Sequence, residues 1–238
     1  MWMRTRHSRF VLAGVLVSAL VWAGCGQLKK MKDAHQAERY ADVAAMDVSC
    51  DPGKDGCNQM HLLKGDACYR LGVKAEMGEE AEPDSTIRRH FRCADTHLGT
   101  GIRQTEAKGA GQWKIAGSDR AQWYLNRAES LRQLRDLSTG DTARAVAERL
   151  LTFGRSYREA LPDAAAPSFY VAKARYALLQ PKLIDVSPGD AAVCDELTEI
   201  QRDLAEAPAE DAADGIRKNI EDLNRQLDLQ RERAECPS

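Results

Sequence analysis

Apolar side chains recur along this chain at steps of three and four residues, and this spacing constrains the fold more than any other feature. Ile87, Phe91, Ala94 and Leu98 follow one another at steps of four, three and four. Residues spaced in this way share one face of a helix. Aromatic residues make up only 6% of the chain, and Ala, Leu, Arg and Glu recur throughout. This composition favours helix, and we expect an all-α protein.

Glycine and proline residues divide the helical pattern into segments. Pro162, Pro167, Pro181 and Pro188 separate the later segments, because proline interrupts a helix. We expect loops over 51–56, over 78–84 and over 99–117, where five glycines predict a long mobile segment. The expected helices cover 27–47, 58–71, 85–98, 118–137, 141–160, 167–180, 189–206 and 210–234.

The amino terminus has the pattern of an export signal. Arg4, Arg6 and Arg9 precede an uncharged apolar run over residues 10–23. A membrane-spanning helix needs roughly 20 apolar residues, and this run is shorter. A basic segment followed by a short apolar run is typical of a signal peptide, which we place at residues 1–24. An uncleaved signal anchor is the alternative.

The end of the apolar run resembles the lipobox of bacterial lipoproteins. Ala23 and Gly24 are the small residues that precede the lipidated cysteine in that family, here Cys25, while Trp22 stands where an aliphatic residue is usual. The resemblance implies cleavage before Cys25, a diacylglyceryl group on its sulfur and an acylated amine, which together anchor a chain strongly. Gly26, rather than Asp, follows the cysteine, so the resemblance implies an outer-membrane lipoprotein that faces the periplasm.

Six further cysteines predict disulfides in an exported chain. Their number is even, and an oxidising compartment favours three bridges. Six cysteines allow 15 pairings. We expect the pairs that would close a loop or join neighbouring helices, namely Cys50–Cys57, Cys68–Cys93 and Cys194–Cys236.

The charge balance argues against a nucleic-acid partner. The whole chain carries a formal net charge of −2. Removal of residues 1–24 takes away three arginines and no acidic residue, which leaves the mature part at about −5. Nucleic-acid-binding proteins carry a dominant basic patch, and this chain shows none.

Consecutive helices can be considered in pairs, and the first helices of three such pairs share a pattern of residue sizes. Tyr124, Ala128 and Leu131 are spaced four and then three residues apart, as are Tyr170, Ala174 and Ala177, and His61, Gly65 and Cys68. A ring followed by a small residue lets paired helices approach closely. This pattern is similar to that of the tetratricopeptide-repeat family, over residues 57–206. We expect helical hairpins stacked in such an array, or an irregular helical bundle, stabilised by disulfides.

The tetratricopeptide resemblance implies a groove that binds a protein or peptide. In that family the groove is lined by residues one and four positions after the small residue. The matching positions here are Asp66, Tyr69, Glu129, Arg132, Arg175 and Leu178. Mixed charged and apolar side chains suit an extended or helical peptide.

Enzyme and metal signals are weak. His90, Cys93 and His97 share a helical face and with Cys68 offer four ligands, but export favours a disulfide, so we expect no metal and no cofactor. The loop at Asp51–Gly56 lacks the final Glu of a calcium loop. No catalytic motif is evident.

We therefore expect a lipid-anchored envelope adaptor and not an enzyme. A purely structural lipoprotein and a cell-wall-acting enzyme are the alternatives. The expected organisation is a signal peptide at 1–24, an anchor, tether helix and loop at 25–56, a helical-hairpin domain at 57–206 and a C-terminal capping helix at 207–238.

Overall fold

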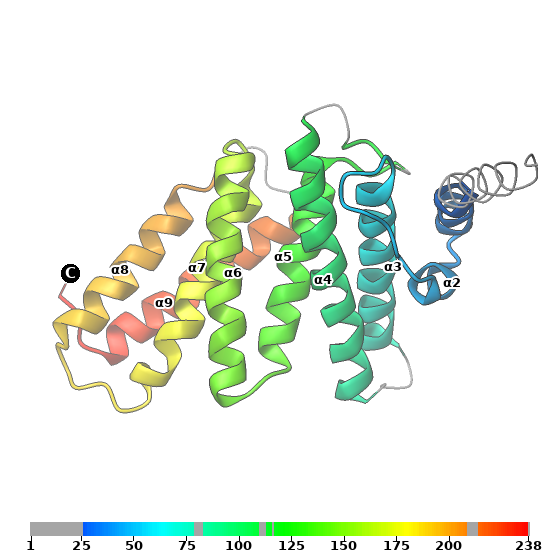
Figure 1. Cartoon of the computed structure of the whole chain (residues 1–238). Coiled ribbons are helices and arrows are strands. Elements are labelled where there is room, and N and C mark those ends of the chain that lie inside the picture. Colours follow the sequence, from blue (N-terminus) through cyan, green and yellow to red (C-terminus); the bar gives the residue numbers. More distant parts are fainter. Residues whose placement is uncertain (1–25, 79–82, 110–112, 116, 209–213, 238) are drawn as a thin grey trace, which may run out of the picture. The chain divides into compact units, whose positions relative to one another are not determined.

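A computed structural model of the chain describes residues 26–78, 83–109, 113–115, 117–208 and 214–237 (Figure 1). The predicted signal peptide and Cys25 lie outside these residues. Within these ranges the protein is all-α, as predicted, and the only β-type pairing is an isolated bridge between Ile115 and Ser118. No helix in these ranges has the length and hydropathy needed to cross a membrane.

The helices largely follow the expected segments. Residues 26–36 are helical. After them come α2 (Tyr40–Ala45), α3 (Cys57–Met77), α4 (Asp84–Lys108), α5 (Arg120–Asp136), α6 (Gly140–Ala160), α7 (Ala165–Leu179), the 3₁₀ helix η2 (Gln180–Leu183), α8 (Ala191–Ala205) and α9 (Asp214–Arg233).

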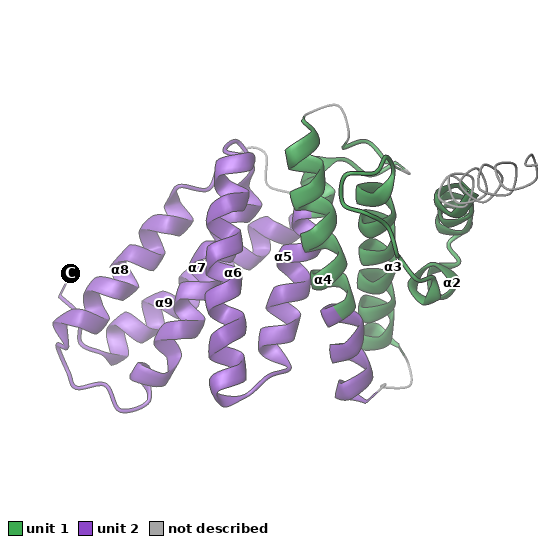
Figure 2. Ribbon diagram, viewed as in Figure 1, with its two compact units in different colours: residues 1–82, 93–123 green, residues 83–92, 124–238 purple. Residues whose placement is uncertain are grey.

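The chain forms two compact units, coloured separately in Figure 2. Unit 1 comprises residues 1–82 and 93–123, and unit 2 comprises residues 83–92 and 124–238. Helices α4 and α5 therefore each contribute residues to both units.

Three predicted boundaries are wrong. The helix expected over 27–47 is interrupted by a turn at Glu38, whose φ is 56°. The helix expected over 58–71 continues to Met77. The loop expected over 99–117 is helical as far as Lys108. Gly101 explains this last error, because a Cβ there would lie 2.9 Å from the backbone nitrogen of Leu62 on α3. This glycine serves close packing between helices and does not make a loop.

Helices α3 and α4 approach each other through reciprocal glycines in unit 1. A Cβ on Gly65 of α3 would lie 2.7 Å from the backbone nitrogen of Leu98 on α4. Gly101 on α4 faces Leu62 on α3 in the same way. Both leucines are fully buried. The predicted small residue at position 65 thus allows this approach, and the disulfide Cys68–Cys93 joins the same two helices.

A buried carboxylate ties the amino-terminal segment to α3. Asp66 has no exposed surface, and its Oδ2 lies 2.7 Å from both Nε2 of His35 and Nε of Arg70. Burial alone would raise the pKa of Asp66, but the hydrogen bonds from His35 and Arg70 hold that pKa below its usual value. The guanidinium of Arg70 also lies 5.1 Å from the ring centre of Tyr40.

Aromatic rings join α5 and α6 in unit 2. The ring of Tyr124 lies 5.6 Å from that of Phe153 and 5.2 Å from that of Tyr157. Helix α7 packs against α6, α8 and α9 and is buried on most sides, in keeping with its apolar sequence. The predicted small residues Ala128 and Ala174 are both fully buried.

Helix α9 packs against α7 and α8 through Leu223 and Leu227. The disulfide Cys194–Cys236 joins α8 to the segment after α9. The third disulfide is Cys50–Cys57. The three expected disulfides are therefore those that the structure forms.

Candidate partner-binding surface

Unit 2 carries an open hollow where the end of α5, the beginning of α6 and the end of α7 meet. Its volume is about 800 Å³. The hollow is lined by Arg135, Asp136, Ser138, Thr139, Gly140, Ala143, Arg144, Glu148, Ala177, Leu178, Gln180, Pro181 and Lys182. We call the part formed by Ala143, Arg144, Leu178, Pro181 and Lys182 the α7-end surface.

Small side chains at the helix ends leave this space open. Gly140 begins α6 with a φ of 56°, a backbone conformation that glycine adopts without strain. Ala143 on α6 and Ala177 on α7 present only methyl groups to the hollow. After Leu179 the chain tightens into η2, with Pro181 in its first turn. The hollow can therefore accept a side chain of several carbon atoms.

Most charges around the hollow are already paired. Arg135 donates to both Asp136 and Gln180. Arg144 lies 3.1 Å from Glu148 in an exposed pair, and exposed pairs contribute little to stability. Lys182 is exposed, and no ion pair joins it to another residue in the described part of the chain. The hollow thus combines an apolar floor with a cation free to contact a partner.

A smaller hollow of about 360 Å³ adjoins the first. It is lined by Leu151, Arg155, Arg175, Leu178, Leu179, Lys182, Ala192 and Glu196. Leu178 and Lys182 line both hollows. Ile184 follows in sequence and is 70% exposed. An elongated partner could therefore contact both hollows on either side of Leu178.

Of the six residues predicted to line a groove, Leu178 lies at this surface most clearly. Arg175 lines the smaller hollow but donates to Glu196 at 2.9 Å and to Asp203 at 2.8 Å. Burial alone would lower the pKa of Arg175, but the hydrogen bonds to Glu196 and Asp203 have the larger effect, so the pKa is raised above its usual value. The Arg175 side chain is therefore held by its own protein.

Glu129 and Arg132 form an ion-pair network on α5. Arg132 Nε donates to Glu129 Oε2 at 2.9 Å, and its Nη1 donates to Asp136 Oδ2 at 2.7 Å. Tyr170 Oη donates to Glu129 at 3.0 Å. Both partners are only about one fifth exposed, so their main role is to link α5 with α7.

Asp66 and Tyr69, the remaining predicted groove residues, belong to unit 1. Asp66 is fully buried in its contacts with His35 and Arg70, so its carboxylate does not line an open groove. Tyr69 is half-buried. Sequence reasoning missed Arg144 and Lys182, whose positions depend on where α6 begins and α7 ends.

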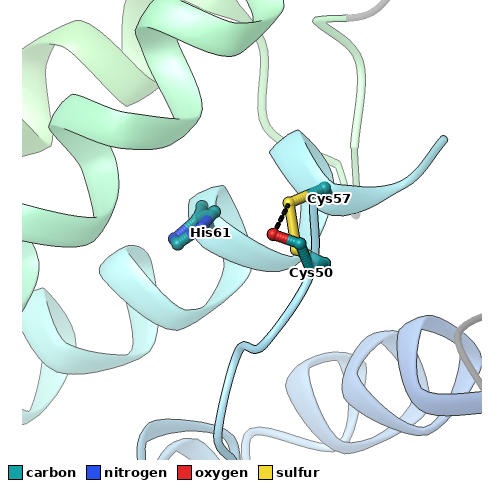
Figure 3. A group of neighbouring side chains, drawn as sticks. All are labelled: Cys50, Cys57 and His61. Atoms are coloured by element: carbon teal, nitrogen blue, oxygen red, sulfur yellow. Dashed lines mark hydrogen bonds between the residues drawn. A yellow bond between two sulfur atoms is a disulfide. The ribbon is translucent and has the colours of Figure 1, made fainter. Parts of the chain in front are cut away.

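A second polar cluster lies in unit 1, where Cys50, Cys57 and His61 come together (Figure 3). His61 also contacts His97 on α4, with 2.9 Å between their Nδ1 atoms. Burial, then the charges of Lys64 and His61, lower the pKa of His97 to about 4, while Asp47 opposes this shift. Burial, then Lys64 and Arg103, lower the pKa of His61. Both rings are therefore neutral at pH 7, and one Nδ1 donates to the other.

The lowered pKa of His97 predicts a loss of stability in mild acid. In the unfolded chain His97 takes up a proton near pH 6.5, whereas in the folded chain it does so only near pH 4. Its contribution to stability is complete above pH 6.5 and is lost as the pH falls to 4. The free energy of unfolding of the wild-type chain should therefore decrease between pH 6.5 and pH 4. In His97→Asn, which can keep a hydrogen bond to His61, we expect this decrease to be smaller than in wild type by on the order of 2 kcal/mol.

Urea denaturation at several pH values, followed by circular dichroism, measures this difference. Carboxylates that titrate in the same range are common to both proteins, so they cancel in the comparison. If the free energy of unfolding falls equally with pH in wild type and His97→Asn between pH 6.5 and 4, the neutral histidine pair would be contradicted.

The metal group considered from the sequence is not assembled. Cys68 and Cys93 are joined in a disulfide, so neither offers a thiolate to His97. Comparison of the chain with protein-family models, curated proteins and solved structures found no match.

Proposed function

We propose that this chain is a lipid-anchored adaptor of a bacterial cell envelope, which binds a protein or peptide segment at the α7-end surface. The open hollow of about 800 Å³ in unit 2 carries this proposal. The proposed anchor is the acylated Cys25, after cleavage of residues 1–24, in the outer membrane facing the periplasm. Three disulfides suit an oxidising compartment of this kind.

The lining of the hollow indicates the chemistry of the partner. Ala143, Leu178 and Pro181 offer apolar contacts, while Lys182 remains without an ion-pair partner in the described residues. A segment with an apolar side chain next to an acidic one would match both features. The stacked hairpins α5–α6 and α7–α8 support a binding surface of the kind that helical repeats provide.

The partners of two buried carboxylates, those of Asp66 and Asp203, favour binding over catalysis. Asp66 is held by His35 and Arg70, and Asp203 is held by Arg158 and Arg175. Carboxylates paired with arginine in this way stabilise a fold, whereas a catalytic acid needs a raised pKa. A purely structural lipoprotein is the alternative, and it predicts that the hollow captures nothing.

Filling the hollow should strongly reduce capture of the partner. Ala143→Arg places a long side chain in the hollow, whereas Ala145→Arg, two residues along the same helix and exposed, does not line it. In cells treated with a cross-linker, followed by purification and mass spectrometry, we expect Ala143→Arg to reduce partner yield at least about tenfold, equivalent to about 1.4 kcal/mol. Ala145→Arg should match wild type.

A charge change at the rim provides a second comparison. Lys182→Glu should weaken capture about three- to tenfold, because an acidic partner would then be repelled. Lys218→Glu makes the same charge change on an exposed part of α9 and should have no effect. Equal capture by all four variants would count against this surface.

A further inference from the structure

Unit 1 carries an open hollow of about 330 Å³ where the helix of residues 26–36 meets α2 (Figure 1). We call it the amino-terminal hollow. It is lined by Lys30, Ala34, Arg39, Asp42, Ala45 and Met46. The lining thus combines two cationic side chains with apolar ones and a single carboxylate.

Contacts outside the amino-terminal hollow hold its walls together. Met31 on the first helix and Val43 on α2 have no exposed surface. Lys64 on α3 donates to the backbone oxygen of Met46 at 2.6 Å, which ties the end of α2 to the rest of unit 1. The shape of the hollow is therefore set by packing within one compact unit.

The positive charge of the hollow continues along the first helix. Lys29 and Lys30 are exposed and Lys32 is half-buried, and within the described part of the chain no ion pair joins any of the three to another residue. Asp33 is the first acidic residue after Cys25, whereas the mature chain as a whole is acidic. This segment therefore attracts an anion, although most of the chain does not.

Arg39 and Asp42 decide which kind of anion fits. Their side chains lie 3.4 Å apart and both are more than half exposed, so the pair is weak. A phosphate oxygen can replace the carboxylate, since arginine binds phosphate through two donors. Asp42 remains beside the ligand and repels additional negative charge. The hollow therefore suits a phosphodiester, which carries one negative charge, better than free phosphate, which carries up to two.

The sequence keeps this hollow close to the proposed acyl anchor. Lys30 follows Cys25 by five residues, which span at most about 18 Å even when fully extended. The headgroup layer of a bilayer is about 5–8 Å thick on each side, and its charge is felt about 8 Å further out in physiological salt. A chain anchored at Cys25 therefore holds Lys30 within reach of phospholipid headgroups, which are phosphodiesters attached to hydrocarbon.

We propose that the amino-terminal hollow binds the headgroup of one anionic phospholipid, so that the chain holds a membrane lipid beside its own acyl anchor. The proposal rests on the proposed lipid anchor, which brings the hollow to the membrane. Lys30 and Arg39 contact the phosphate, and the apolar lining contacts the glycerol and the first acyl carbons. A zwitterionic headgroup binds less well, because Lys29 and Lys30 repel its ammonium group.

Native mass spectrometry of the purified full-length chain in detergent tests this proposal. The solution contains dioleoyl phosphatidylglycerol, which is anionic, or dioleoyl phosphatidylcholine, which is zwitterionic, at the same concentration. We expect one bound phosphatidylglycerol per chain, and at least about fivefold less bound phosphatidylcholine. Inorganic phosphate in excess should not displace the lipid. Displacement by phosphate, or equal binding of the two lipids, would overturn the assignment to an anionic phospholipid.

Charge changes separate this hollow from general attraction to a basic protein surface. Lys30→Glu/Arg39→Glu should bind at least about tenfold less phosphatidylglycerol. Lys218→Glu/Arg225→Glu is the matched control on α9, where Arg225 forms an exposed pair with an aspartate three residues away, as Arg39 does. This control should bind as wild type does. Lys30→Arg keeps the charge and should retain binding. Circular dichroism of each variant establishes that the helices persist.

The same spectra report the mass of each chain, and hence whether Cys25 is acylated. An acylated wild-type chain that binds no phosphatidylglycerol would overturn the headgroup site and leave the anchor standing. So would equal binding by wild type and Lys30→Glu/Arg39→Glu. A chain that binds the lipid through these two residues without acylation at Cys25 would support the headgroup site and contradict the anchor.

Discussion

Replacing Gly65 with alanine is expected to lower the free energy of unfolding by about 3 kcal/mol, although alanine is normally the better helix former. The added Cβ would lie 2.6 Å from Cγ of Leu98 and 2.7 Å from its backbone nitrogen. A side chain can rotate away, but a backbone nitrogen cannot. Helices α3 and α4 must therefore separate, and overpacking of this kind costs about 1–3 kcal/mol or more. The usual gain of about 0.5–1 kcal/mol for alanine in a helix is much smaller.

Gly215 provides the control for this change. It lies in the first turn of α9, and a Cβ there would meet nothing within 4 Å. Gly215→Ala should be neutral or slightly stabilising. Chemical denaturation of both variants measures the difference, and equal midpoints for Gly65→Ala and wild type would show that α3 and α4 are not in such close contact.

Removal of the Cys194–Cys236 disulfide has the second large expected effect, a loss of about 4 kcal/mol. The bond spans 42 residues, and the entropy of closing a loop of that length in the unfolded chain corresponds to about 4 kcal/mol. The Cys50–Cys57 bond spans only 7 residues, which corresponds to about 2 kcal/mol. Cys194→Ala/Cys236→Ala should therefore be clearly less stable than Cys50→Ala/Cys57→Ala.

Hydrogen exchange identifies the helices that lose stability when this disulfide is removed. Helix α9 is held by Leu223, Leu227 and the bond to α8, so its amides should lose protection first in Cys194→Ala/Cys236→Ala. Amides of α3 should keep their protection near the native level. Equal destabilisation of the two double variants would contradict the argument from loop length.

The helices and disulfides were predictable because their signals are local. The step of four and three in Ile87, Phe91 and Ala94 marks a helical face from neighbouring residues alone. The bonds Cys50–Cys57 and Cys68–Cys93 join segments that are adjacent in sequence order, and Cys194–Cys236 encloses a single helix, α9. Residues 99–108 were not predictable in this way, since Gly101 takes its role from Leu62 on another helix.

The candidate surface was predictable only in part, for the same reason. Leu178 was predicted as a groove residue from a family resemblance in residue spacing. Lys182 and Ala143 line the hollow because α7 ends, and α6 begins, beside it, and sequence patterns locate helix ends less accurately than helix faces. The burial of Asp66 depends on His35, 31 residues away.

The mass of the mature chain isolated from the membranes of its own cells tests the proposed anchor most directly. Peptide mapping without reduction should find an amino terminus at Cys25 that carries a thioether-linked diacylglyceryl group and an acylated amine. The same map should place the six other cysteines in the three disulfides of the structure. An intact Met1 with a free thiol at Cys25 would contradict the proposed export, anchor and adaptor role together.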